Sequence, residues 1–116
     1  MPGLLFERGL WTSGTLQTDP AGGALLVDTG QLPEGDYLFG FVGFATALTV
    51  YDIELRNAAN GATIRSQRRR FPAGNEDVLI PSKVYLETNQ RLRAMLVGAI
   101  VGDVQLSVFH YGVGSP

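Results

Sequence analysis

The sequence has no cysteine and only one histidine, His110, among its 116 residues. Structural zinc sites, iron–sulfur clusters and redox thiols need cysteines or several histidines, so we expect no metal, no cofactor and no disulfide. No Gly-x-Ser-x-Gly element, phosphate-binding loop or dinucleotide fingerprint occurs. The paired acidic residues Asp52 with Glu54 and Glu76 with Asp77 are interpreted as surface charge, and His110 as a hydrogen-bonded residue at a strand end. We therefore expect that the protein is not an enzyme.

Charge of either sign is scarce as well. Nine Lys and Arg residues face eleven Asp and Glu residues, for a net charge of −2. A phosphate backbone attracts a broad basic surface, so we expect no nucleic-acid partner. The apolar runs are far shorter than the ~20 residues that cross a membrane, and no signal-peptide pattern is present, so we expect neither membrane insertion nor export by a signal peptide. The length fits a single domain over residues 1–116.

Turn signals divide the sequence into short segments. Pro-x-Gly units at residues 20–22, 33–35 and 72–74, together with Asn60-Gly61, are typical of chain reversals. The segments between the turns are rich in β-forming residues, and they predict strands over residues 4–11, 24–28, 37–44, 48–56, 63–71, 77–80, 83–87, 91–97 and 104–111. No segment has the apolar period of a helix. This spacing predicts an all-β fold, a single antiparallel β-sandwich of about eight strands that is jelly-roll-like.

Alternation indicates which face of a strand is buried. Val104, Leu106 and Val108 point to one side of the predicted strand 104–111, while Gln105 and Ser107 point to the other. Such a strand has one face in the core and one face in water.

The segment 37–44 departs from this pattern, because both of its faces are apolar. Phe39 and Phe41 lie on one face, and Val42 and Phe44 lie on the other. One face of such a strand contacts another chain unless loops or the first segment cover it. We take Phe39, Phe41 and Phe44 as candidate interface residues.

The first eleven residues form a second apolar segment, an arm or first strand with only Glu7 and Arg8 as charges. It either completes its own sheet or reaches across to a neighbouring subunit. The candidate interface residues of this arm are Leu4, Leu5, Phe6, Leu10 and Trp11. Residues 112–116 are expected to be a loose tail.

The only run of basic residues is Arg68, Arg69 and Arg70. Either these residues bind an acidic protein partner, or they protect an edge strand from unwanted pairing. If Asn60-Gly61 forms a two-residue turn, residues whose numbers sum to about 121 lie opposite each other. Asp52 then faces Arg69, and the outer face of the hairpin becomes a ladder of opposite charges.

This layout resembles the small jelly-roll decoration or cement proteins of tailed bacteriophage capsids. The features that carry the resemblance are the short cysteine-free chain, the apolar arm, and the strand starts Leu32-Pro33-Glu34-Gly35-Asp36-Tyr37 and Gln90-Arg91-Leu92-Arg93. The resemblance implies a structural protein of the virion, a homo-oligomer with a trimer favoured, that sits on the major capsid protein and stabilises the shell.

Two other functions remain open at this stage. Trp11, Tyr37, Tyr51, Tyr85 and Tyr111 could line the platform of a carbohydrate-binding module, because aromatic rings stack on sugars. A head–tail or tail connector subunit of the same kind of virus would share the fold and the oligomeric habit.

Overall fold

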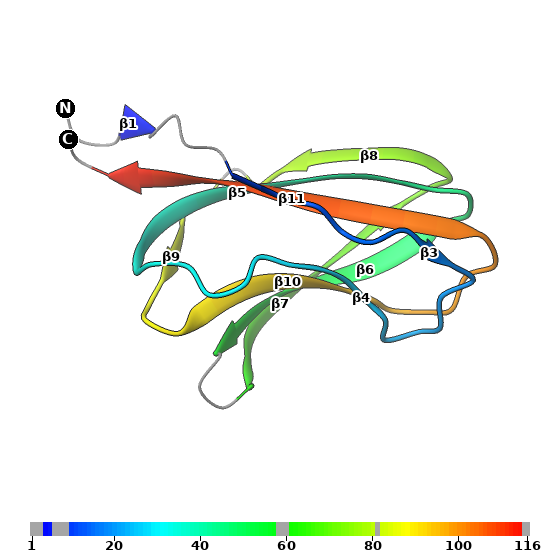
Figure 1. Ribbon diagram of the computed structural model, residues 1–116, viewed down its shortest axis with the longest axis horizontal. Coiled ribbons are helices and arrows are strands. Elements are labelled where there is room, and N and C mark those ends of the chain that lie inside the picture. Colours follow the sequence, from blue (N-terminus) through cyan, green and yellow to red (C-terminus); the bar gives the residue numbers. More distant parts are fainter. Residues whose placement is uncertain (1–3, 6–9, 58–60, 81, 115–116) are drawn as a thin grey trace.

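The computed structural model describes residues 4–5, 10–57, 61–80 and 82–114. These residues form eleven antiparallel strands and no helix, so they include no helix that could span a membrane. The strands are β1 (Leu4–Leu5), β2 (Leu10–Thr12), β3 (Gln17–Thr18), β4 (Leu25–Asp28), β5 (Gly35–Ala45), β6 (Thr49–Asn57), β7 (Thr63–Phe71), β8 (Gly74–Leu79), β9 (Val84–Leu86), β10 (Gln90–Leu96) and β11 (Asp103–Gly114). Figure 1 shows them as two layers, with β5, β8 and β11 in the upper layer and β4, β7 and β10 in the lower one.

Each layer is about four strands wide, because several short strands lie one after another along the same edge of a long strand. β1, β2 and β3 pair along one edge of β11, and β8 and β9 pair along one edge of β5. The path through the seven-stranded sheet is β1-β11-β5-β8, and the four-stranded sheet has the order β4-β10-β6-β7. Among the long strands, only β6 and β7 are both consecutive in the sequence and adjacent in one sheet. This arrangement of the strands is that of a jelly roll. The structure confirms the predicted all-β sandwich.

The core lies between the two sheets and follows the predicted alternation. Val104, Leu106 and Val108 of β11 are buried. Phe39 and Phe41 of β5 have no exposed surface at all and pack in the same core. Their assignment to a protein interface was therefore wrong, because the inner face of β5 is covered by the four-stranded sheet of the same chain.

The register of the β6–β7 hairpin differs from the predicted one by one residue. Asp52 lies opposite Arg68, not Arg69. Asn57 donates its N–H to the carbonyl of Ala62, and Gly61 donates to the carbonyl of Asn57, so the turn is longer than the assumed two-residue Asn60-Gly61 turn. Because side chains alternate along a strand, this shift moves each arginine of β7 to the opposite face.

The arm and the tail meet at the same end of β11. Leu4 pairs with Gly114 and Leu5 with Val113, while Leu10 pairs with His110. The described part of the arm therefore completes its own sheet, the first of the two alternatives. The prediction of a loose tail was wrong for residues 112–114, because these residues belong to β11. Residues 115–116 lie outside the described residues.

Candidate functional site

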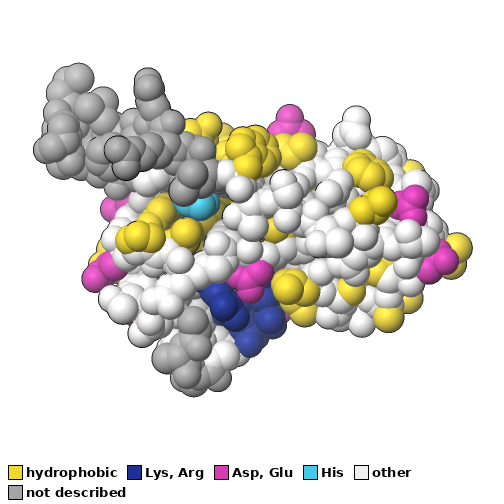
Figure 2. All heavy atoms as spheres, in the orientation of Figure 1, with side chains coloured by type: hydrophobic (Ala, Val, Ile, Leu, Met, Phe, Trp, Pro, Cys, Tyr) yellow, Lys and Arg dark blue, Asp and Glu magenta, His cyan; other side chains and the backbone are white. Residues whose placement is uncertain are grey.

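The outer face of the seven-stranded sheet is apolar and partly exposed. We call it the aromatic face, and its members are Trp11, Leu38, Val42, Phe44, Leu79, Phe109 and Tyr111. Trp11 is 60% exposed and Leu79 is 55% exposed. In Figure 2, hydrophobic side chains are visible along the upper side of the molecule, where Figure 1 places this sheet.

A row of residues that are paired across four strands forms the middle of the aromatic face. Trp11 of β2 lies opposite Phe109 of β11, Phe109 opposite Gly40 of β5, and Gly40 opposite Leu79 of β8. A side chain at Gly40 would overlap the Phe109 ring, so the ring lies directly over this glycine. The absence of a side chain at position 40 thus makes the space that Phe109 occupies.

Three aromatic rings continue along this side of the sheet. The centroids of Trp11 and Phe109 are 4.8 Å apart with the ring planes tilted by 49°, and those of Phe109 and Tyr111 are 5.6 Å apart in an edge-to-face arrangement. Both separations lie in the range where aromatic pairs attract. The rings therefore form one packed cluster at the surface, and Trp11 is its most exposed member.

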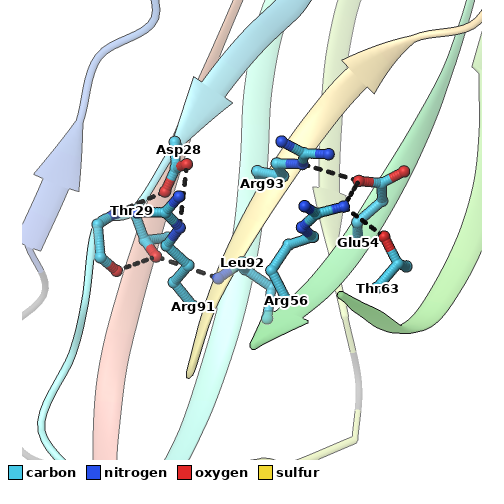
Figure 3. Close-up of polar contacts among 9 residues, drawn as sticks. Asp28, Thr29, Glu54, Arg56, Thr63, Arg91, Leu92 and Arg93 are labelled. Atoms are coloured by element: carbon cyan, nitrogen blue, oxygen red, sulfur yellow. Dashed lines mark hydrogen bonds and ion pairs between the residues drawn. The ribbon is translucent and has the colours of Figure 1, made fainter. Parts of the chain in front are cut away.

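The outer face of the four-stranded sheet has the opposite character, because ion pairs cover it. We call it the charge ladder, and its members are Asp28, Asp52, Glu54, Arg56, Arg68, Arg91 and Arg93. Glu54 accepts a hydrogen bond of 2.7 Å from Nε of Arg93 and lies 3.7 Å from Nη1 of Arg56 (Figure 3). On the opposite edge of β10, toward β4, Nε of Arg91 lies 3.4 Å from Asp28 (Figure 3). Figure 2 shows Lys and Arg side chains gathered next to an acidic one on the lower part of the molecule, where Figure 1 places the four-stranded sheet.

The basic run does not form one patch, because its members alternate between the two faces of the edge strand β7. Arg68 points outward and donates two hydrogen bonds to Asp52, of 2.9 and 3.2 Å, which raise the pKa of the Arg68 guanidinium. Arg70 also lies on the outer face, opposite Val50, and is exposed. Arg69 points inward, opposite Tyr51, and is half-buried.

Two polar groups are buried between the sheets. The Tyr51 hydroxyl donates a hydrogen bond of 3.1 Å to the Glu76 carboxylate, and burial, followed by the nearby Glu76 charge, raises the pKa of Tyr51 far above its ordinary value. His110 packs against the rings of Tyr37 and Phe39, and its Nδ1 atom has no hydrogen-bond partner in the described structure. Burial lowers the pKa of His110, so its neutral form is favoured. Glu76 is thus buried and not surface charge, and the hydrogen bond predicted for His110 stays a prediction.

The eleven predicted interface residues are therefore divided between several places. Trp11 and Phe44 both lie on the aromatic face, and Phe44 is 38% exposed. The three arginines belong to the other sheet. The strand positions of Leu4, Leu5 and Leu10 are described but not their side chains, and Phe6 lies outside the described residues.

Phe109 was missed by the sequence analysis although it is central to the aromatic face. The sequence did contain a signal for it. Phe109 and Tyr111 occupy the phase of Gln105 and Ser107, so they are large aromatic residues on the side of β11 that alternation assigns to water.

Neither a protein-family model nor a curated protein matches the chain. Within the described residues, no group of three His, Cys, Asp or Glu side chains could hold a metal ion. The candidate functional site is thus the aromatic face, defined by its own geometry.

Proposed function

We propose that this chain is a structural protein that assembles into a small homo-oligomer through the aromatic face and binds the outside of a larger protein shell, as a capsid decoration protein of a bacteriophage virion does. The observation that supports this proposal is the contrast between the two outer faces. One carries an apolar row with an exposed Trp11 and Leu79, beside which Asp77 is the charged neighbour on β8, and the other is a ladder of ion pairs. Apolar patches of this kind mark association surfaces on soluble proteins.

A second copy of the chain is the partner that suits the aromatic face. The four ion pairs found among the described residues all lie on the other sheet, and on the aromatic face the row from Trp11 to Leu79 carries no charge. The row from Trp11 to Leu79 is also apolar, so an apolar patch elsewhere on a neighbouring copy complements it, and such contacts between different patches close a ring.

The size of the face determines how strong each contact is. From Leu38 to Phe44 it is about 20 Å long, and across three strand spacings it is about 14 Å wide, so its flat area is roughly 300 Å². A standard interface buries about 800 Å² on each partner. One contact through this face alone is therefore weak, and stable assembly comes from closing a ring and from many identical sites on the shell.

Molar mass in solution tests this proposal through two matched substitutions. Leu79→Glu places a charge on the aromatic face, whereas Leu25→Glu places the same charge on β4 of the other sheet, at a leucine of similar exposure (46% against 55%). We expect size-exclusion chromatography with light scattering to give an oligomer, with a trimer favoured, for the wild type and for Leu25→Glu. We expect a smaller mass for Leu79→Glu with an unchanged circular dichroism spectrum.

Two outcomes would refute the proposal. One is a wild-type protein that stays monomeric at its highest soluble concentration. The other is an oligomer that Leu79→Glu leaves intact, because the contact would then lie elsewhere on the molecule.

The ring cluster also favours a second candidate function, carbohydrate binding. Trp11, Phe109 and Tyr111 stand together at the surface, and exposed rings of this kind stack on the apolar faces of sugars. Trp11 is the only tryptophan, so its fluorescence reports on this site alone. A saturable shift of the emission during titration with oligosaccharides, together with a monomeric protein, would favour this function over assembly.

A further inference from the structure

A groove of about 430 Å³ opens between the two sheets on the side of β7, away from the aromatic face. Its floor is Ile53, Leu55 and Leu92, three buried core residues on the inner face of the four-stranded sheet. Ile80 and Val84, at the connection between β8 and β9, form the facing wall. The volume lies within the range of small-molecule sites, which is roughly 300–1,000 Å³.

The rim of this groove is basic. Arg65 of β7 and Lys83 line the groove together with the neutral side chains Ser66, Gln67 and Ser82, and no acidic residue is part of the lining. Neither Arg65 nor Lys83 forms an ion pair with any of the described residues, whereas Arg68 on the other face of the same strand does. Both cations are exposed.

This combination defines the chemistry of a ligand. A floor made of aliphatic side chains takes an apolar tail, and two unpaired cations at the rim take an anionic head, because Arg and Lys both bind carboxylates. The groove as a whole reaches from Leu92 of β10 across β6 to Gln67 of β7, two strand spacings or about 10 Å, which allows a tail of medium length.

We propose that the groove binds an aliphatic carboxylate of the medium-chain fatty-acid class, with its tail on Ile53, Leu55 and Leu92 and its carboxylate between Arg65 and Lys83. This site does not depend on the proposed assembly function, because the groove and the aromatic face lie on different sides of the sandwich. An oligomer without fatty-acid binding, or a monomer with it, would separate the two proposals.

Isothermal titration calorimetry with hexanoate, octanoate and decanoate, all below their micelle concentrations, tests the tail. Each buried methylene contributes about 0.8 kcal/mol, so we expect the affinity to rise about four-fold for each added methylene until the floor is filled. Octanol and octylamine have the same tail without the carboxylate, so they test the contribution of the anionic head. We expect both to bind at least ten-fold more weakly than octanoate.

Variants locate the site. Arg65→Gln combined with Lys83→Gln should weaken octanoate binding ten-fold or more. The matched control for Arg65→Gln alone is Arg70→Gln, which removes the same single charge from the outer face of the same strand and should leave the affinity unchanged. Gln67→Trp should fill the groove and abolish binding while the circular dichroism spectrum is retained.

The proposal is overturned if no member of the series gives saturable binding, or if octanol binds as tightly as octanoate. It is also overturned if Arg70→Gln weakens binding as much as Arg65→Gln alone, because attraction by net charge would then explain the signal. Shifts of the Ile53, Leu55 and Leu92 methyl resonances on addition of octanoate are the expected confirmation, and shifts confined to other residues would contradict it.

Discussion

Gly40 gives the sharpest test of the aromatic face, because a single methyl group there affects the surface and not the core. In Gly40→Ala the new Cβ atom would overlap the ring of Phe109. The ring is a side chain, so it can rotate away, but it then leaves its positions against Trp11 and Tyr111. The backbone pairing of β5 with β11 is preserved.

The expected magnitude follows from these contacts. An aromatic pair contributes about 0.5–1.5 kcal/mol beyond its buried area, so losing two pairs costs about 1–3 kcal/mol. Replacing a glycine within a strand returns about 0.5–1 kcal/mol, because the unfolded chain of the variant has less freedom to lose. The net loss is about 0–2.5 kcal/mol with a midpoint of about 1 kcal/mol, which for a chain of this size lowers Tm by about 4–5 °C.

Thermal unfolding and the emission of Trp11 measure this effect together. Gly43→Ala is the comparison, because a side chain there would meet the Gln105 carbonyl and the Leu106 backbone, which cannot rotate away. We expect Gly43→Ala to lower Tm further but to leave the Trp11 emission unchanged, since Trp11 lies on the opposite face of the sheet. If Gly40→Ala kept both the wild-type Tm and the wild-type emission, Phe109 would not lie over Gly40 and the reasoning would fail.

Three further substitutions test the interior. Phe41→Ala should destabilise the fold by about 3–5 kcal/mol in urea unfolding, because the ring is fully buried; a loss below 1 kcal/mol would contradict its place in the core. Tyr51→Phe should cost about 1–3 kcal/mol in the same assay, because the Glu76 carboxylate loses the Tyr51 hydroxyl and keeps the Asp77 N–H as donor. An unchanged stability would mean that the Tyr51–Glu76 hydrogen bond contributes nothing to the fold. Burial lowers the pKa of His110, so the unfolded chain binds more protons and stability should decline as the pH falls through about 6.5. His110→Leu should remove that part of the pH dependence, which Tm measured between pH 8 and pH 5 would show.

The sequence predicted the strands of the sandwich well, because period-two alternation is a local signal. Leu92, Ala94 and Leu96 of β10 are all buried, as their spacing indicates. The β6–β7 register was missed because it depends on the length of one turn. A shift of a single residue moved the partner of Asp52 from Arg69 to Arg68, and with it the side on which each arginine lies.

The candidate site was harder to predict, because it depends on strands that are far apart in the sequence. Segment 37–44 was correctly seen as apolar on both sides, but only the sheet order shows that Phe41 is covered and Phe44 is not. The place of Phe109 over Gly40 is set by the pairing of β5 with β11, whose register no local pattern reveals. The groove is likewise formed between β7 and the β8–β9 connection, and its prediction requires knowing how the two sheets pack.

The position of β11 has a consequence for how the chain is made. This strand pairs with β1, β2, β3 and β5, yet it leaves the ribosome after the other ten described strands. Until then the N-terminal strands have no partner, and the inner aromatic residues of β5 cannot be enclosed in a finished sandwich. Pairing Leu4 with Gly114 then closes a loop of nearly the whole chain, a slow step with a large entropic cost. The nascent chain is thus expected to remain unfolded and prone to aggregation for most of its synthesis. It should therefore depend on chaperones that bind its apolar segments until β11 has been synthesised.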